Sequence, residues 1–355
     1  MKENDKTPNL FDFATSELSH DAFIAWLLSW ADPSFKDQQL HTFSQAVLFD
    51  FIEITGKNIP DVQKVDVKTQ YRNIDVLVLL TDESGQRWVV IVENKMHTRE
   101  HSDQLNRYRE DIHKDEKLED ITDSHILGIY YKMWEQSDMG RVKKSEFFHF
   151  GRGHMLKLLE ENYKSGTSDI VDQYFQYLSG IQLELDAFQK KAVKDWNSTQ
   201  WTGLYTKLKE ELNDGDFGYI PNRSGGFMGY WFGGCDIDAD ANIYVQSEQD
   251  KLCFKIYVGK KEDRQSAKWF WHDAVIKAGK SIGLEIVKPK VMRTGQWFTI
   301  GVLNTDDDKP WMKTDDENIV QLPETIEIAR KATQVVKKAS EKQSEWECYK
   351  IEHKI

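Results

Sequence analysis

Cysteine, proline and long apolar runs are all scarce in this sequence of 355 residues. Its three cysteines lie far apart and form no C-x-x-C pair, which argues against a disulfide framework and against a zinc module. Seven prolines exclude a proline-rich linker. The longest unbroken apolar run, residues 22–28, is far shorter than the roughly 20 residues of a membrane span. These absences predict a cytoplasmic protein with no membrane partner.

Acidic residues outnumber basic ones, 59 to 47, which gives a net charge of −12. Such an excess argues against a general polyanion-binding protein. The excess is uneven, because residues 251–300, here called the basic window, contain 11 basic and 4 acidic side chains. Residues 1–150, 151–250 and 301–355 are each net negative. The basic window is therefore either a solvated face or a nucleic-acid-facing surface.

The spacing of apolar residues changes from helical to strand-like within the first 150 residues. Helices are expected over about residues 16–28, 38–54 and 100–111, and strands over about 61–71, 74–80, 88–92, 126–131 and 147–150. Their order predicts an α/β fold with an α-β-β-β-α-β core and added helices. Two further helices, over about 153–163 and 168–188, extend this part of the chain.

A compositionally distinct second domain is expected after residue 195, because eight of the twelve tryptophans follow that point. Strands over 217–258 and up to 302, with helices near 199–212, 265–279 and 324–339, predict an α+β arrangement there. Residues 225–234 interleave glycine with aromatic residues, which is typical of a closely packed strand and less often of a base-stacking surface. We expect domains over 1–190 and 196–355.

The most informative segment is a predicted hairpin around the turn Asp82–Gly85. Asp75 is a lone charge in an apolar strand, and Glu93 and Lys95 end the next strand on a shared face. A turn centred on Ser84 places residues whose numbers sum to 168 opposite each other, so Asp75 faces Glu93. Cβ atoms of such cross-strand partners are about 5 Å apart.

Two carboxylates at that distance repel each other unless a cation lies between them. Their hard oxygen atoms suit Mg²⁺ or Mn²⁺, and Lys95 beside them could orient a water molecule or stabilise charge on a phosphate. The three residues fit a buried ion-pair network equally well, because perturbed acids also occur in purely structural roles. On the following helix, Gln104 and Tyr108 lie four residues apart and share a face.

The ordered set Asp75, Glu93-Asn94-Lys95 and Gln104-x-x-x-Tyr108 resembles the PD-(D/E)XK nuclease superfamily, in its RecB-like branch with a Q-x-x-x-Y helix. The segment from Glu17 to Leu28 is similar to the opening helix of an uncharacterised bacterial branch of that superfamily. The resemblance covers about residues 10–150, and no part of residues 196–355 carries it. It implies a restriction-endonuclease-like core.

The resemblance also implies a set of roles. Asp75 and Glu93 would bind Mg²⁺ or Mn²⁺ with the Asn94 main-chain carbonyl, and Lys95 would activate the attacking water. Gln104 and Tyr108 would position the substrate backbone, and Glu17 would be a further metal ligand or would fix Lys95. The implied function is a metal-dependent nuclease acting on DNA, or less often RNA, with a C-terminal domain that binds substrate or partner. The alternative is a catalytically inactive binding module for nucleic acid or protein on a nuclease fold.

Overall fold

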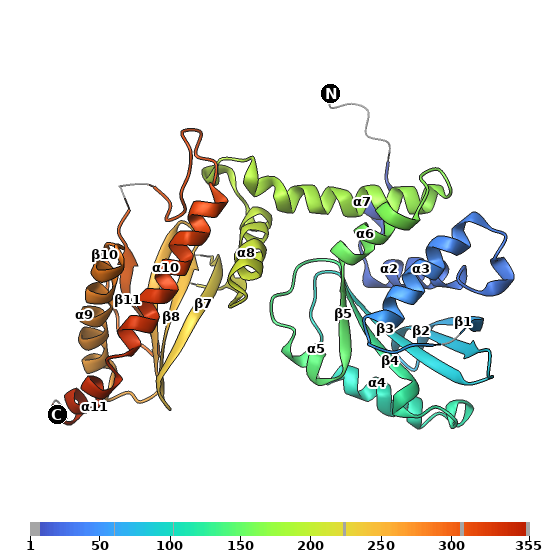
Figure 1. Ribbon diagram of the computed structural model, residues 1–355, viewed down its shortest axis with the longest axis horizontal. Helices are drawn as coiled ribbons and strands as arrows, with labels where there is room; N and C mark the ends of the chain where they lie inside the picture. Colours follow the sequence, from blue (N-terminus) through green and yellow to red (C-terminus); the bar gives the residue numbers. More distant parts are fainter. Residues whose placement is uncertain (1–7, 60, 102, 223–224, 306–308, 353–355) are drawn as a thin grey trace. The chain divides into compact units, whose positions relative to one another are not determined.

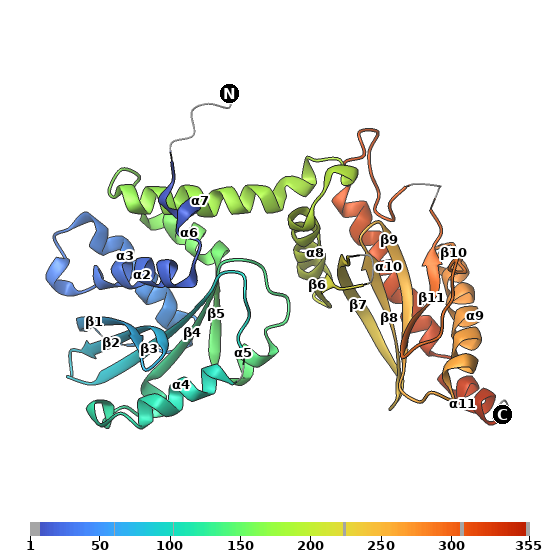
Figure 2. The same cartoon turned by 180° about the vertical axis from the view of Figure 1, so that it is seen from behind.

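The computed structural model describes residues 8–59, 61–101, 103–222, 225–305 and 309–352 (Figures 1 and 2). The chain divides into two compact units, Met1–Gln182 and Leu183–Ile355. Each is a mixture of helices with one β-sheet, so the expected α/β class and the α+β C-terminal part are confirmed. The limits 1–190 and 196–355 stay a prediction. Among the described residues, no helix is both long and apolar enough to cross a membrane.

The N-terminal unit is built on a sheet with the strand order β1-β2-β3-β4-β5. Its strands are β1 (Val62–Tyr71), β2 (Ile74–Asp82), β3 (Arg87–Lys95), β4 (Ile126–Lys132) and β5 (Phe147–Gly151). Its helices are α1 (Leu10–Phe13), α2 (Glu17–Ser29), α3 (Gln39–Glu53), α4 (Gln104–His113), α5 (Gly140–Lys144), α6 (Arg152–Asn162) and α7 (Asp169–Asp186), which continues into the second unit. The expected α-β-β-β-α-β order is therefore confirmed; α1 and α5 were not predicted.

Two short turns fix how β1, β2 and β3 pair. Between β1 and β2, Arg72 and Asn73 both have positive φ angles, the conformation of the two-residue turns that match the twist of a hairpin. Between β2 and β3, the Asp82 carboxylate accepts hydrogen bonds from the backbone N–H groups of Ser84 and Gln86. Val76 then pairs with Val92 and Leu77 with Ile91, so the predicted register is confirmed.

The sheet changes from antiparallel to parallel at β3, which pairs antiparallel with β2 and parallel with β4. Helices cover both faces (Figure 1). On one face, α4 contributes Leu105, Tyr108 and Ile112 to a core shared with Val89 and Ile91 of β3. The other face carries α2. Every residue of β4 is buried, as expected for an inner parallel strand covered on both sides.

The C-terminal unit contains an antiparallel sheet with the strand order β10-β11-β9-β8-β7-β6. Its strands are β6 (Asp216–Ile220), β7 (Phe227–Asp238), β8 (Ala241–Glu248), β9 (Lys251–Val258), β10 (Ile286–Val287) and β11 (Trp297–Leu303). Its helices are α8 (Ser198–Leu212), α9 (Arg264–Ile282), α10 (Leu322–Ser340) and α11 (Gln343–Glu352). The glycine-rich segment at 225–234 leads into and forms part of β7, so its prediction as a strand is confirmed.

The basic window does not form one surface. Trp271 is fully buried in the core of this unit, and Arg264 donates hydrogen bonds to the carbonyl groups of Val258 and Gly259. Lys260 forms an ion pair of 3.0 Å with Asp240. Only part of the basic window is therefore free to contact a partner. The sequence could not show this, because the window spans a helix and several strands, and composition does not separate structural residues from exposed ones.

Candidate active site

Asp75, Glu93 and Lys95 meet at one end of the β2–β3 hairpin. Asp75 is the second residue of β2, and Glu93 and Lys95 are buried near the end of β3, two residues apart on one face. Continuing the register from Val76 and Val92 places Asp75 opposite Glu93. Asp75 also accepts a hydrogen bond of 3.1 Å from the backbone N–H of Asn94. The structure therefore brings together the three residues that the sequence predicted as catalytic.

The Glu93 carboxylate is completely buried, with 0% of its surface exposed. Lys95 Nζ lies 2.5 Å from Glu93 Oε1, yet neither Glu93 oxygen accepts a well-formed hydrogen bond from the described residues. Burial and the nearby Asp75 charge raise the pKa of Glu93 to about 8. Lys95 is therefore the close cationic partner of Glu93, and a metal ion beside Asp75 would compete for the same carboxylate.

Glu17 contacts the chain that follows β3. It is the first residue of α2, which Ser16 caps through a hydrogen bond with the Ser19 N–H. Its carboxylate accepts hydrogen bonds from Thr98 Oγ1 at 2.6 Å and from Lys95 Nζ at 3.5 Å. Although burial opposes it, these contacts hold the pKa of Glu17 below its usual range. These contacts fit the predicted role of fixing Lys95, and the role of Glu17 as a metal ligand stays a prediction.

The Asn94 side chain ties β3 to the helices. Its amide nitrogen donates to Asp21 Oδ1 at 2.8 Å, so its oxygen faces His20 Nδ1, 2.7 Å away. His20 Nδ1 must therefore carry the proton, and Nε2 accepts from the Tyr174 hydroxyl at 2.6 Å. Burial lowers the pKa of His20 to about 4, which keeps the ring neutral. This chain of hydrogen bonds fixes the strand that carries Glu93 and Lys95.

Asp21 is an acidic residue at the site that the sequence reasoning missed. It is 2% exposed, and burial together with the Asp75 charge raises its pKa to about 7. Its spacing of one helical turn from Glu17 was a usable signal, because residues i and i+4 share a helix face. Asp21 brings a third carboxyl group close to Asp75.

Lys132, the last residue of β4, was also missed. It pairs in register with Lys95, and its ammonium group donates to the carbonyl groups of Met96 and Thr98 at 2.8 and 2.6 Å. Burial lowers its pKa to about 8. Lys132 thus holds the segment whose Thr98 contacts Glu17. The sequence offered a signal, since Lys132 directly follows the apolar run 126–131 that was predicted as a strand.

Gln104 and Tyr108 lie on the α4 side of the site. The Gln104 amide donates a hydrogen bond to the Tyr108 hydroxyl, so the predicted shared face is confirmed. Burial and the Glu93 charge raise the pKa of Tyr108, which keeps the phenol neutral. Tyr108 also belongs to the apolar core, so part of its role is structural. The Gln104 carbonyl oxygen is buried without a hydrogen-bond donor among the described residues.

The donor set suits a hard divalent cation better than zinc. Within the described residues, no group of three or more His, Cys, Asp and Glu side chains is arranged to hold a metal ion. Mg²⁺ does not require such a cage, because it commonly binds one or two carboxylates and completes its shell with waters and phosphate oxygens. The buried carboxylate of Glu93, with Asp75 opposite, supplies the two carboxylates of such a site.

A family model described as the PD-(D/E)XK nuclease superfamily matches residues 8–214, more than half of the chain. The fold and the site agree with this match, and the chain belongs to that superfamily. The match extends through α8, so the expectation that no part of residues 196–355 carries the family pattern was wrong. The sequence motifs end at Tyr108, and the later helices carry no motif that would have shown the longer extent. No curated protein and no solved structure matches the chain.

The raised pKa values at this site predict a stability that falls as pH rises. Glu93 and Asp21 keep protons up to about pH 8 and about pH 7 in the folded state, whereas their ordinary pKa values are 4.5 and 3.8. Between these limits the folded state binds more protons than the unfolded state, so alkali favours unfolding. Below about pH 6.5 the buried His20, whose pKa is lowered to about 4, offsets part of this effect. Without metal, the melting temperature should therefore drop between about pH 6.5 and about pH 8, and Mg²⁺ should restore it at the higher pH.

Thermal melts of wild type and Glu93→Gln, each in EDTA and in excess Mg²⁺, check this expectation. The glutamine variant should show a shallower pH dependence and a smaller Mg²⁺ effect, because it has lost a titrating carboxyl group. Equal slopes for the two proteins would contradict the assignment of the raised pKa to Glu93.

Proposed function

We propose that this protein is a Mg²⁺-dependent nuclease that hydrolyses phosphodiester bonds of DNA, with RNA as the second substrate class and Mn²⁺ as a substitute metal. The observation that carries the proposal is the buried Glu93 carboxylate, which lies opposite Asp75 and forms an ion pair with Lys95. Two carboxylates and a lysine in this arrangement suit the hydrolysis of a charged phosphate ester. Membership of the nuclease superfamily supports the substrate class.

Each site residue has a defined task in this proposal. Asp75 and Glu93 would supply carboxylate oxygens to the cation, and the Asn94 main-chain carbonyl would supply a further oxygen ligand. A bound Mg²⁺ would neutralise charge on the reacting phosphate and acidify a water molecule. Lys95 holds a fixed positive charge where the attacked phosphate becomes more negative. Its position is set by the contact with Glu17.

Gln104 and Tyr108 provide neutral hydrogen-bonding groups beside Glu93, which suit the oxygens of a nucleic-acid backbone. Their mutual hydrogen bond fixes both side chains. Because the Tyr108 phenol stays protonated, it can donate a hydrogen bond to a phosphate oxygen without adding negative charge.

A second candidate function is an inactive binding module on the same fold. The ion pair of 2.5 Å between Lys95 and Glu93 favours it, because a buried lysine can by itself neutralise a buried carboxylate. In that case the site would be a structural network, and nucleic acid or protein would bind without being cleaved.

Incubation of the full chain with four matched substrates separates the two functions: single- and double-stranded DNA and RNA of one sequence, each with Mg²⁺, Mn²⁺ or EDTA. We expect cleavage of at least one DNA form with Mg²⁺ or Mn²⁺ and none in EDTA, because the carboxylates need a cation to act on a phosphate. A protein inert on all four substrates with both metals would be the binding module instead.

A further inference from the structure

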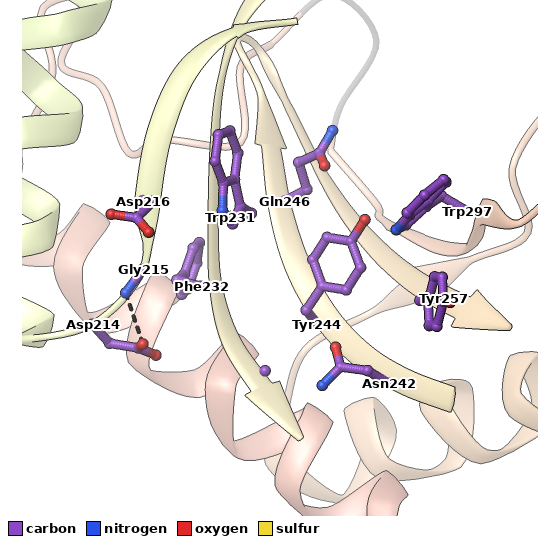
Figure 3. A pocket seen from close by; sticks show the side chains of 11 residues that line it. Asp214, Gly215, Asp216, Trp231, Phe232, Asn242, Tyr244, Gln246, Tyr257 and Trp297 are labelled. Carbon is purple, nitrogen blue, oxygen red and sulfur yellow. Dashed lines mark hydrogen bonds between the residues drawn. The ribbon is translucent and has the colours of Figure 1, made fainter. Parts of the chain in front are cut away.

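The sheet of the C-terminal unit is covered on one face and open on the other. Tyr230 and Val245 of the sheet share a core with Leu204 of α8, Trp271 of α9 and Val335 of α10. Because side chains alternate along a strand, the residues next to these core positions point to the opposite face. Figure 3 looks onto that face, with side chains standing on the strands and helices behind them.

An aromatic groove of about 580 Å³ lies on the open face. Four of its aromatic side chains come from four different strands: Trp231 of β7, Tyr244 of β8, Tyr257 of β9 and Trp297 of β11 (Figure 3). Trp297 is 59% exposed, and its ring centre lies 5.2 Å from that of Tyr257. Aromatic rings that are exposed on a sheet offer flat surfaces on which bases stack.

Two amide side chains stand between these rings. Gln246 is paired across the sheet with Trp231, and Asn242 with Tyr257. Both amides are held in place, because the Gln246 nitrogen donates to Glu248 at 3.0 Å and the Asn242 nitrogen to Asp236 at 2.9 Å. Fixed amides beside stacking surfaces are suited to the hydrogen-bonding edges of unpaired bases.

The two ends of the groove differ in charge. Beyond Trp297, which both share, a second hollow of about 360 Å³ is lined by Lys255 and Arg293 from the basic window. Lys255 forms an ion pair of 2.6 Å with Glu248, so Arg293 is the cation that this end offers to a ligand. Arg293 is exposed, as a group that attracts phosphates must be.

The acidic residues at the opposite end are engaged within the protein. Asp214 accepts hydrogen bonds from the backbone N–H groups of Gly215 and Gly233, and Asp216 forms an ion pair of 2.6 Å with Lys209. Their negative charge is therefore partly compensated. The charge that the groove offers to a ligand is positive and lies at the Arg293 end.

We propose that the aromatic groove binds a single-stranded segment of nucleic acid, whose bases stack on Trp231 and Trp297 and whose phosphates run toward Arg293. The proposal rests on the proposed function, because superfamily membership and the positive end together select a nucleic acid over a neutral sugar chain. In this proposal the C-terminal unit binds unpaired strands of any sequence. Stacking is available to every base, so no base preference is expected.

Binding of a fluorescently labelled single-stranded 20-mer to the full chain, in EDTA so that no cleavage can occur, tests the groove. Trp231→Ala and Trp297→Ala should each weaken binding by about 5- to 100-fold, the effect of losing one stacked base. Trp297→Phe should retain most of the wild-type affinity, because a smaller aromatic ring still stacks on a base. The matched control is Trp269→Ala, since Trp269 is 43% exposed but belongs to α9, outside the groove.

Comparing the DNA and RNA forms of the 20-mer shows which sugar the groove prefers. The proposal is supported if either form binds and if its binding weakens when Trp231 or Trp297 is replaced. Three outcomes overturn it: no binding of either strand by wild type, equal binding by wild type and groove variants, or tryptophan quenching by a neutral oligosaccharide but not by nucleic acid. The assay needs no catalysis. A protein that binds through the groove yet cuts nothing would overturn the proposed function alone, and a protein that cuts but ignores the groove would overturn this inference alone.

Discussion

Replacing Lys95 by alanine is expected to lower the rate of phosphodiester cleavage by about 10²–10³, the typical loss when one preorganised electrostatic stabiliser is removed. Lys95 is 5% exposed and is held between Glu93 and Glu17 at 2.5 and 3.5 Å. Its ammonium group is therefore fixed before substrate arrives. Nucleic-acid binding should change little, because one buried charge adds little to a contact made mainly by exposed cations.

Single-turnover cleavage in Mg²⁺ measures the chemical step, and binding in EDTA measures affinity separately. Thermal melts are needed as well, since removing one partner of a buried ion pair leaves the other uncompensated. Lys68→Ala is a matched control, because Lys68 lies on β1 and pairs with the exposed Asp66. If Lys95→Ala cleaves as fast as wild type, the lysine has no part in the reaction.

Asp75→Asn is expected to weaken Mn²⁺ binding strongly, because Asp75 is a proposed metal ligand. The loss of affinity should exceed the roughly 10–100-fold that follows when a residue hydrogen-bonded to a metal ligand is changed. Asparagine has nearly the shape of aspartate, and its oxygen can still accept the hydrogen bond from the Asn94 N–H. The fold should therefore survive. Without metal, the variant should even be more stable above about pH 7, because Asp75 no longer repels Glu93 and Asp21.

Calorimetric titration with Mn²⁺, together with melts in EDTA, checks both parts of this expectation. Asp66→Asn, on β1 and half-exposed, is the matched control. Unchanged Mn²⁺ binding in Asp75→Asn would remove Asp75 from the metal site. A wild type that binds no Mn²⁺, with a variant of increased stability, would show that the carboxylates are only a strained structural pair.

The hairpin that holds the site could be predicted from the sequence because it is local. The Asp82–Gly85 turn sets the register within a few residues, and Asp75 and Glu93 are separated by one turn of the chain. The Gln104–Tyr108 pair is equally local, since both residues lie on one helix. Helix and strand order followed from the same short-range patterns of apolar residues.

The contacts that hold the site in place could not be predicted because they join distant parts of the chain. The bond from Asn94 to Asp21 and the support of Thr98 by Lys132 depend on how α2 and β4 pack against β3. Nothing in the spacing of these residues encodes that packing. In the C-terminal unit, composition showed a basic window but not which of its side chains are buried, and Trp271, which lies within the window, belongs to the core.

The length of the Asp82–Gly85 turn also affects how the site residues are placed. Side chains alternate between the faces of a strand with a period of two, so a change in the length of this turn that slipped the β2–β3 register by one residue would move either Asp75 or Glu93 to the opposite face. A two-residue change would keep the face but offset the carboxylates along the strands. The turn contains no proposed site residue, yet the register that it sets decides whether the two acids face each other.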